Sequence, residues 1–308
     1  MNKKYTQFNT HLREIFQEKV YKVTLDAGFS CPNRDGTISN LGCIFCDNSG
    51  SFSQAHDCHL PIKEQLLTGI EQLSSRFGAK KFISYFQAFS NTYAPVKVLE
   101  NTYTQALDHP DVVGLSIGTR PDCVDIEKIS MIENIAKDYY TWLEYGLQSA
   151  NNKTLEYINR GHTLEDFLYA VDITKNKNIK ICTHIIIGLP TDTKKDILNT
   201  AKILADCGID GVKIHLLCVL KNTILEKMYN DGLIKIWNQE EYIETVCDFL
   251  ELLPKNIIIH RMAGNGLKKD LIEPKWLPKK FEILNQINDK LIERNSYQGK
   301  FATIISTN

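Results

Sequence analysis

The stretch Cys31-Pro-Asn-Arg-Asp-Gly-Thr-Ile-Ser-Asn-Leu-Gly-Cys43-Ile-Phe-Cys46 places three cysteines in one loop. The close spacing of Cys43 and Cys46 lets two thiolates face one metal centre. Turn-forming residues such as Asp35 and Gly36 bring Cys31 back toward them. Three thiolates are one ligand short of the four that close a structural zinc or iron–sulfur site. The loop therefore predicts a metal site with one position open to a ligand, which is typical of a catalytic centre.

Around this loop the hydrophobic pattern alternates between two periods. Apolar and β-branched runs predict strands at residues 20–26, 80–87, 112–118, 141–147, 179–187 and 212–217. Helical spacing predicts helices at 62–77, 94–107, 124–139, 164–175, 196–206, 225–230 and 240–252. This alternation is typical of right-handed βαβ units in a parallel sheet, and six units are fewer than the eight of a closed barrel. We therefore predict an α/β fold, an open partial (β/α)6 barrel.

The barrel is expected to fill residues 20–252, after a lead-in at 1–19 and before a C-terminal extension at 253–308. In the extension we expect only a short apolar run at 257–260 and a final helix near 281–293, packed on the barrel. The 308 residues, 43% of them hydrophobic, suffice for one large core. Apolar runs are too short for a membrane span, and the first residues lack a signal-peptide core. Nine cysteines without such a signal predict reduced thiols and a cytoplasmic protein.

Polar side chains and glycines follow each of the predicted strands. Because ligands bind at the carboxyl ends of parallel strands, these segments are expected to share one face with the cysteine loop. The candidate site residues in these segments, together with one inside the fourth strand, are Gln87, Arg120, Asp122, Glu144, Gln148, Arg160, Gly188 and His215.

The cysteine loop, which ends in Phe45-Cys46, resembles the cluster loop of the radical SAM superfamily. There, three cysteines hold a [4Fe–4S] cluster and S-adenosylmethionine chelates the fourth iron. The usual spacing is three and then two residues, and the longer first spacing found here resembles the branch related to the Elongator catalytic subunit. Within that branch, residues 31–37 are very close to the bacterial YhcC-like family. The resemblance covers nearly the whole chain and implies a radical SAM enzyme with Cys31, Cys43 and Cys46 as cluster ligands.

The same resemblance implies roles in binding the cofactor. Glu144 and Gln148 belong to a segment that resembles the fourth-strand motif flanking the methionyl and ribose parts of S-adenosylmethionine. Residues 159–163 resemble the Arg-Gly-His segment of the Elongator-like branch, where Arg160 is expected to pair with the cofactor carboxylate. Gly188 falls in a fifth-strand motif that packs on adenine.

Four further candidates complete the set that the resemblance suggests. Gln87 occupies the region whose backbone usually binds the methionyl amine, although the familiar Gly-Gly-Glu is absent. His215, at the end of the sixth strand, is also expected to bind the cofactor. Arg120 and Asp122, in Gly-Thr-Arg-Pro-Asp, are expected to contact the substrate.

Simpler interpretations stay open at this point. Glu144 would be a surface strand residue, Arg160 would pair with Glu156 one helical turn earlier, and Thr163-Leu-Glu-Asp166 would be a helix capping box. The alternative function is a zinc-stabilised binding protein that uses the cysteine loop, with a fourth ligand from Cys58 or from the nearby His56 and His59.

The resemblance implies that the reduced cluster cleaves S-adenosylmethionine to a 5′-deoxyadenosyl radical, which abstracts hydrogen from an unknown substrate. An electron donor such as flavodoxin or ferredoxin is then required. RNA, a small metabolite and a protein side chain are the substrate classes left open, and transfer RNA enters because the Elongator-like branch acts on it.

The net charge of −1 hides basic chain ends. Residues 1–22 carry five Lys and Arg against two acids, and residues 251–308 carry ten against six. Ordinary solvation of the surface is the simplest interpretation. If both ends lie at the barrel mouth, they form a basic rim on which Tyr5, Phe8, Trp276 and Phe281 stack on exposed bases. The basic residues of that rim would be Lys3, Lys4, Arg13, Lys19, Lys22, Arg261, Lys268, Lys269, Lys275, Lys279 and Lys280.

Overall fold

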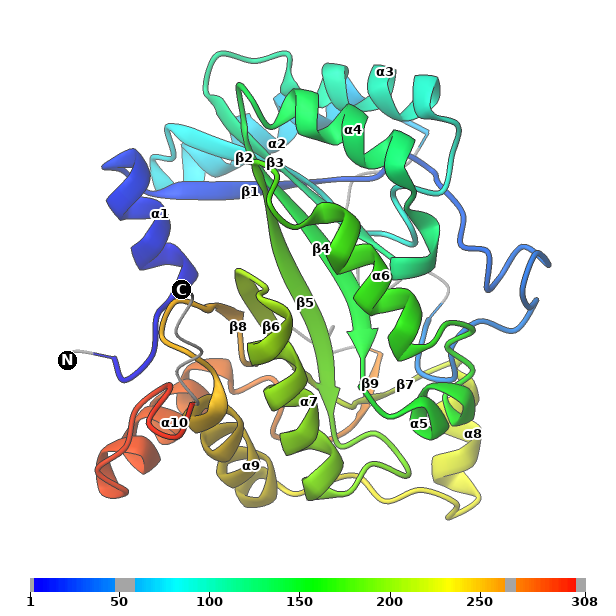
Figure 1. The fold of residues 1–308 in the computed structure, drawn as a ribbon, viewed down its shortest axis with the longest axis vertical. Coiled ribbons are helices and arrows are strands. Elements are labelled where there is room, and N and C mark those ends of the chain that lie inside the picture. Colours follow the sequence, from blue (N-terminus) through cyan, green and yellow to red (C-terminus); the bar gives the residue numbers. More distant parts are fainter. Residues whose placement is uncertain (1–2, 48–58, 264–269, 303–308) are drawn as a thin grey trace.

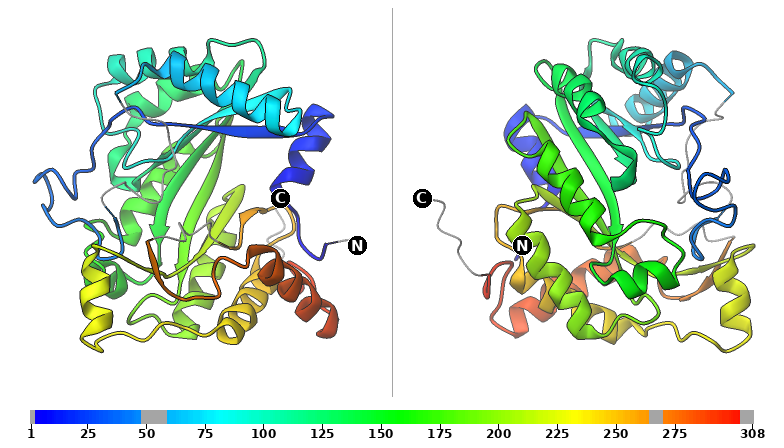
Figure 2. Two further views of the ribbon diagram at one scale, coloured as in Figure 1. Left: turned by 180° about the vertical axis from the view of Figure 1, so that it is seen from behind. Right: turned by 45° about the vertical axis from the view of Figure 1, so that its right-hand side comes forward.

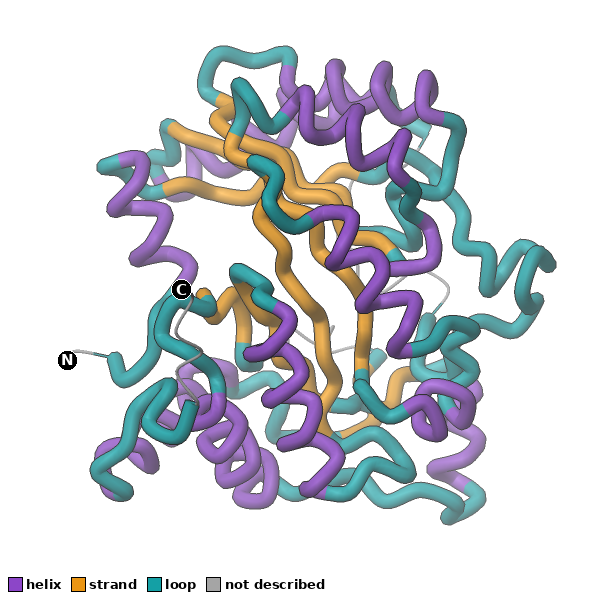
Figure 3. The backbone as a smooth tube through the Cα atoms, viewed as in Figure 1, coloured by secondary structure: helices purple, strands orange, loops and turns teal. Residues whose placement is uncertain are grey.

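The structure is a computed structural model that describes residues 3–47, 59–263 and 270–302. Seven parallel strands form one sheet in the order β1-β2-β3-β4-β5-β6-β8, which curls into an open half-barrel (Figure 1, Figure 3). The partial barrel is therefore confirmed, with one strand more than the six expected. The strands are β1 (Val20–Leu25), β2 (Lys81–Phe86), β3 (Val112–Thr119), β4 (Tyr140–Gln148), β5 (Ile179–Ile187), β6 (Gly211–Leu216) and β8 (Ile258–Arg261).

The additional strand, β8, arises from the apolar run in the C-terminal extension. Ile258 and Ile259 are buried, and β8 pairs in parallel with β6. Four residues are too few to display the alternating pattern of a strand in the sequence. They form a strand because the edge of β6 offers backbone hydrogen-bond partners. The sequence analysis found the apolar run at 257–260 but did not expect it to add a strand to the sheet.

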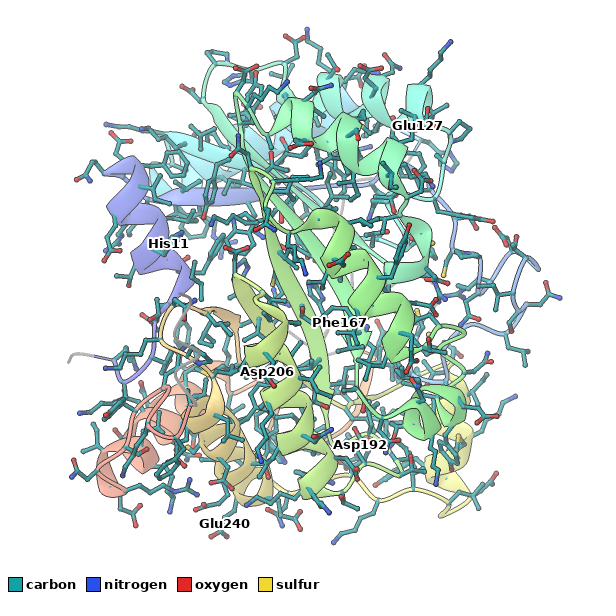
Figure 4. The ribbon with its side chains drawn as sticks, in the orientation of Figure 1. His11, Glu127, Phe167, Asp192, Asp206 and Glu240 are labelled. Carbon is teal, nitrogen blue, oxygen red and sulfur yellow. The ribbon has the colours of Figure 1, made fainter. Side chains whose placement is uncertain are left out.

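Helices cover the outer face of the half-barrel, as the views from both sides show (Figure 1, Figure 2). Side chains alternate along each strand. On β4, Leu143 and Tyr145 therefore face the helices and join the core there, while Glu144 between them points into the barrel. Phe167 of α6 is fully buried with its ring 6.4 Å from that of Tyr145 (Figure 4). The outer helices are α2 (Ile62–Phe77), α3 (Val96–Leu107), α4 (Ile126–Ile135), α6 (Leu164–Thr174), α7 (Lys194–Cys207) and α9 (Gln239–Leu252).

Helix α1 (Phe8–Phe16) closes the amino-terminal end of the barrel. Phe8 and Leu12 pack on Trp142 near the start of β4, and the His11 ring lies 2.7 Å from the Tyr140 hydroxyl (Figure 4). The ribbon views place α1 and the loop after β1 on opposite sides of the molecule (Figure 2). Tyr5 and Phe8 are buried, so the expectation that they stack on bases at the mouth was wrong.

The C-terminal segment packs against the barrel. Helix α10 (Lys280–Glu293) lies on α9, and the side chain of Gln298 accepts from Thr6 N and donates to Ile257 O. Within the described residues, no helix is long and apolar enough to cross a membrane. The remaining elements are α5 (Asn152–Tyr157), α8 (Ile224–Asn230), a 3-10 turn at Pro121–Cys123, and the antiparallel pair β7 (Val219–Leu220) and β9 (Leu271–Glu273).

Candidate active site

The cysteine loop is held by the segment that follows α5. The Asn33 amide donates to Asn159 O at 2.6 Å, and the Asn159 amide donates to Gly42 O at 2.6 Å. Gly161 has a φ of +72°, and a Cβ there would lie 2.9 Å from Ile38. A glycine is therefore required where the two segments meet. The segment 159–163, singled out in the sequence, therefore holds the cysteine loop in place through Asn159 and Gly161.

Arginines lie beside two of the three cysteines of the loop. The distances are 3.5 Å from Arg160 Nη1 to Cys43 Sγ and 3.6 Å from Arg34 Nη1 to Cys46 Sγ. Arg120 lies within electrostatic reach of Cys31. Cationic N–H donors favour the thiolate form of cysteine, which is the form that binds metal.

None of the three thiols is in a disulfide. Burial, followed by the nearby Cys43, raises the pKa of Cys46 to about 11, and Cys31 contributes to that rise. Among the described residues, no three His, Cys, Asp or Glu side chains are already grouped around one metal position. Three thiolates repel one another until a positive centre neutralises them. The donor set, with three cysteines in one loop and an arginine beside two of them, fits a [4Fe–4S] cluster with one iron open.

Arg160 links the cysteine loop to β4. Its Nη2 donates to Gly146 O at 2.7 Å, and its Nε donates to His162 Nε2 at 2.9 Å. A Cβ at Gly146 would lie 2.7 Å from Nη2 of Arg160, so this position accommodates the guanidinium because it is a glycine. The structure thus brings Arg160 to Cys43 and Gly146 instead of to Glu156. Burial, assisted by Arg160 and Arg120, lowers the pKa of His162 to about 2, so this ring is neutral.

Arg120 and Asp122 are bound to each other. Arg120 donates from Nε and Nη2 to the two carboxylate oxygens of Asp122 at 2.8 and 2.6 Å, and from Nη1 to Arg160 O at 2.7 Å. Arg120 is only 1% exposed, and neither residue lines the cavity described next. The pair supports the backbone of Arg160.

The capping box that the sequence suggested at Thr163-Leu-Glu-Asp166 is confirmed. Thr163 and Asp166 cap the first turn of α6.

A cavity of about 1180 Å³, open mouth included, lies at the carboxyl ends of the strands. Phe89 and Gln148 line it with left-handed backbones, at φ of 60° and 76°. Such conformations are uncommon in residues other than glycine and concentrate at functional sites. The cavity brings together many of the residues predicted from the sequence, namely Cys43, Cys46, Gln87, Glu144, Gln148, Arg160 and His215.

Gly188, in contrast, does not line this cavity. It has a φ of +87°, and a Cβ there would lie 3.5 Å from the indole of Trp237. Trp237 of the protein itself therefore packs beside this glycine, in the motif for which the resemblance implies contact with adenine.

The floor of the cavity carries a buried charged network centred on Glu144. Its carboxylate accepts from Lys22 at 2.7 Å and from Ser116 at 2.6 Å on one oxygen. The other oxygen accepts from Tyr85 at 3.0 Å, from His184 at 2.9 Å and from Lys213. These cations and donors hold the pKa of Glu144 well below its usual range in spite of burial. Glu144 is therefore not a surface residue, and its hydrogen-bonding capacity is already used.

Lys213 and His184 were not among the residues expected from the sequence, and Lys22 was expected on a basic rim and not beside Glu144. Burial lowers the pKa of Lys213 to about 8, and burial and then Lys213 lower the pKa of His184 to about 4. The sequence offered one indication of Lys213, because this lysine stands between Val212 and Ile214, two buried apolar residues of the same strand. A lysine between apolar strand residues indicates an inward-facing charge only when the partner strand is known.

The Radical SAM superfamily model matches residues 35–220, and the Radical_SAM C-terminal domain model matches residues 209–293. The chain belongs to the radical SAM superfamily. The protein YtqA of Bacillus subtilis is 42% identical over 303 residues, covering 97% of this chain and 93% of YtqA. The protein YhcC of Escherichia coli K12 is 35% identical over 300 residues, covering 97% of this chain and 96% of YhcC. The predicted YhcC-like resemblance is confirmed.

Similarity to the Elongator-like branch is also found. The tRNA uridine(34) acetyltransferase of Methanocaldococcus jannaschii is 32% identical over 146 residues, which are 46% of this chain and 26% of that protein. The structure of Elp3 from Methanocaldococcus infernus has a TM-score of 0.70 at 19% identity, covering 91% of this chain and 64% of that chain. This structural likeness shows a shared radical SAM fold.

The radical SAM chain is therefore an enzyme that uses a [4Fe–4S] cluster and S-adenosylmethionine. The alternative of a zinc-stabilised binding protein is not supported by this family membership. Two of its proposed ligands, His56 and Cys58, lie outside the described residues.

Proposed function

We propose that Cys31, Cys43 and Cys46 hold the cluster of this radical SAM enzyme, and that its substrate is a nucleoside of transfer RNA. When bound, the reduced cluster supplies the electron that cleaves S-adenosylmethionine to methionine and a 5′-deoxyadenosyl radical, the species that abstracts hydrogen from the substrate. The observation that carries the choice of RNA is a basic and aromatic segment, residues 275–281, at the edge of the cavity.

The residues of the cavity wall have distinct proposed tasks. Arg34 and Arg160 hold the thiolates of Cys46 and Cys43 by charge-assisted hydrogen bonds. Gln87 and Gln148 line the cavity and are proposed to bind S-adenosylmethionine, whereas His215, which the sequence also suggested for the cofactor, is proposed for the substrate instead. Their amide groups offer neutral donors and acceptors for a zwitterionic ligand without adding charge.

Three further residues are proposed to hold other side chains of the site in position without touching the substrate. Arg120 and Asp122 position Arg160 rather than touching substrate, since both are engaged with each other away from the cavity. Glu144 keeps Lys22 and Lys213 paired beneath the cavity, which gives the radical a rigid and enclosed floor.

The segment 275–281 joins the cavity to the surface. Leu277 lines the cavity, while Lys275 and Lys279 on either side of it are exposed. Phe281 is 80% exposed, which is unusual for a phenylalanine and suits stacking on a base. Lysines near the mouth suit the phosphates that flank such a base. The sequence similarity to proteins named tRNA uridine(34) acetyltransferases is a second, independent argument for transfer RNA as the substrate.

The basic rim proposed here is smaller than the one expected from the sequence. Lys22 and Arg261 point into the barrel, and Lys268 and Lys269 lie outside the described residues. The exposed Lys19 precedes β1 at the amino-terminal end, away from the mouth. It therefore provides a matched control for charge at the opposite end.

The test is a titration of the reconstituted enzyme with transfer RNA at low and moderate salt. Binding by the wild type should weaken as salt rises because counterions are released. The double variant Lys275→Glu with Lys279→Glu should weaken binding and reduce the salt slope by about 2, whereas Lys19→Glu should behave as wild type. If binding is absent at low salt, or is indifferent to salt and to charge reversal, the substrate is a small molecule or a peptide.

A further inference from the structure

Arg261, the last residue of β8, lines the cavity but has no partner for its guanidinium. Among the described residues it makes no hydrogen bond and no ion pair, and its side chain is only partly exposed. Arginines that are partly withdrawn from water are normally paired with a carboxylate or a carbonyl oxygen. An unpaired guanidinium in a cavity wall indicates that its partner arrives with a ligand.

A β-bulge turns Arg261 into the barrel. Ile259 opposes Val212 and Arg261 opposes Lys213, so His260 is an extra residue on β8. In a regular strand His260 and Arg261 would point to opposite faces. Here the His260 ring stacks 3.9 Å from Phe8 inside the barrel, and Arg261 also faces inward, to the cavity. Bulges beside active sites commonly re-aim a side chain in this way.

Two cations, Arg261 and Lys213, stand on neighbouring strands of this wall beside the neutral imidazole of His184. His184, Lys213 and Arg261 occupy matching positions on β5, β6 and β8. Of the described residues that line the cavity, only Asp47 and Glu144 are acidic, and the carboxylate of Glu144 already accepts from five side chains. Arg261 contributes to lowering the pKa values of Lys213 and His184, as expected for an uncompensated positive charge.

His215 offers a second unused group on the same wall. Its Nε2 atom is buried without a hydrogen-bond partner among the described residues. Its ring centroid lies 5.2 Å from that of His184. Burial, with His184 and Arg261 next in effect, keeps the pKa of His215 well below its ordinary value, so the ring is neutral and carries one N–H.

We infer that Arg261 and His215 form a subsite for an anionic oxygen group of the substrate, a carboxylate or a phosphate. The planar guanidinium matches either group with two parallel N–H donors, and the imidazole adds a third. The inference rests on the proposed function in one respect, namely that the substrate enters this same cavity.

The subsite is separate from the place proposed for the carboxylate of S-adenosylmethionine. β8 and β1 are the two opposite edges of the sheet, and the cysteine loop follows β1. Arg160, which we associate with the cofactor, touches Cys43 at the cluster loop. Arg261 faces the cavity from the far edge, where a substrate has to be held to present its C–H bond to the cofactor.

The experiment titrates the anaerobically reconstituted enzyme, saturated with S-adenosylmethionine, with inorganic phosphate and with acetate in a calorimeter at low ionic strength. The variants are Arg261→Gln and Arg261→Lys, with Arg76→Gln on α2 as the exposed arginine control. We expect one anion equivalent to bind wild type and Arg76→Gln alike. Arg261→Gln should weaken it at least tenfold, and Arg261→Lys less, because charge remains without the fork.

The outcomes separate the possibilities. Binding of phosphate alone assigns the subsite to a phosphate, and binding of acetate assigns it to a carboxylate. If neither anion binds, or if Arg261→Gln binds as wild type does, the inference is overturned. It is also overturned if Arg261→Gln weakens the affinity for S-adenosylmethionine, because the arginine then serves the cofactor. Anion binding without transfer-RNA binding would retain the subsite and reject the RNA proposal.

Discussion

The guanidinium of Arg160 lies 3.5 Å from the sulfur of Cys43 while it also holds the carbonyl oxygen of Gly146 on β4. One side chain thus connects the cluster loop to the inner face of the barrel. A charged donor at a ligating sulfur affects the stability of the reduced cluster, and its anchoring on β4 fixes the direction from which it acts. Two segments far apart in the sequence therefore make one site.

The number of cysteine ligands is directly testable. After anaerobic reconstitution the wild type should contain about four irons per chain and absorb visible light. Cys43→Ala should abolish both signals, because two remaining thiolates cannot hold the cluster. Cys58→Ala should retain them, and iron assays with absorption spectra measure both. A requirement for Cys58 would show that the site has four protein ligands and no open iron.

Arg160→Ala should leave the iron content largely intact, because all three thiolates remain. The reduction potential of the cluster should become more negative, since a cation that stabilises the reduced form is lost. Binding of S-adenosylmethionine should also weaken if the arginine reaches the cofactor carboxylate. Redox titration followed by electron paramagnetic resonance and equilibrium binding provide the measurements, with Arg76→Gln as control. An unchanged affinity would remove Arg160 from the cofactor site.

The stability of the cluster-free protein should depend on pH through His184. The folded state lowers the pKa of this ring to about 4 from an ordinary 6.5, so the unfolded chain binds the proton more readily. The stabilisation is therefore complete above pH 6.5 and is lost as pH falls from there toward 4. His184→Gln removes this titration but retains a donor for Glu144.

We expect denaturation curves of His184→Gln to show a shallower loss of stability between pH 6.5 and 4 than those of the wild type. The lowered pKa of Glu144 acts in the same direction, but its contribution is lost only below the ordinary glutamate range, so it is present in both proteins. Identical slopes in the two proteins would mean that His184 is not held neutral by its surroundings.

Much of the fold was accessible from local pattern. The predicted strand at 179–187 and the predicted helix at 62–77 coincide with β5 and α2. Both segments are long enough to show the spacing of apolar residues that is typical of a strand or a helix, so each could be predicted without knowledge of its neighbours. β8 was missed because four residues do not display a period, and they form a strand only against β6.

The sequence by itself determined the alternation of strands and helices and the three-cysteine loop, because spacing and periodicity are properties of neighbouring residues. Tertiary structure alone decided which charges meet. Glu144 is 122 residues from Lys22 and 69 from Lys213, and only the curl of the sheet brings the three together. The direction of Arg261 likewise depends on a bulge against β6, since one extra residue in a strand reverses the face to which its side chains point.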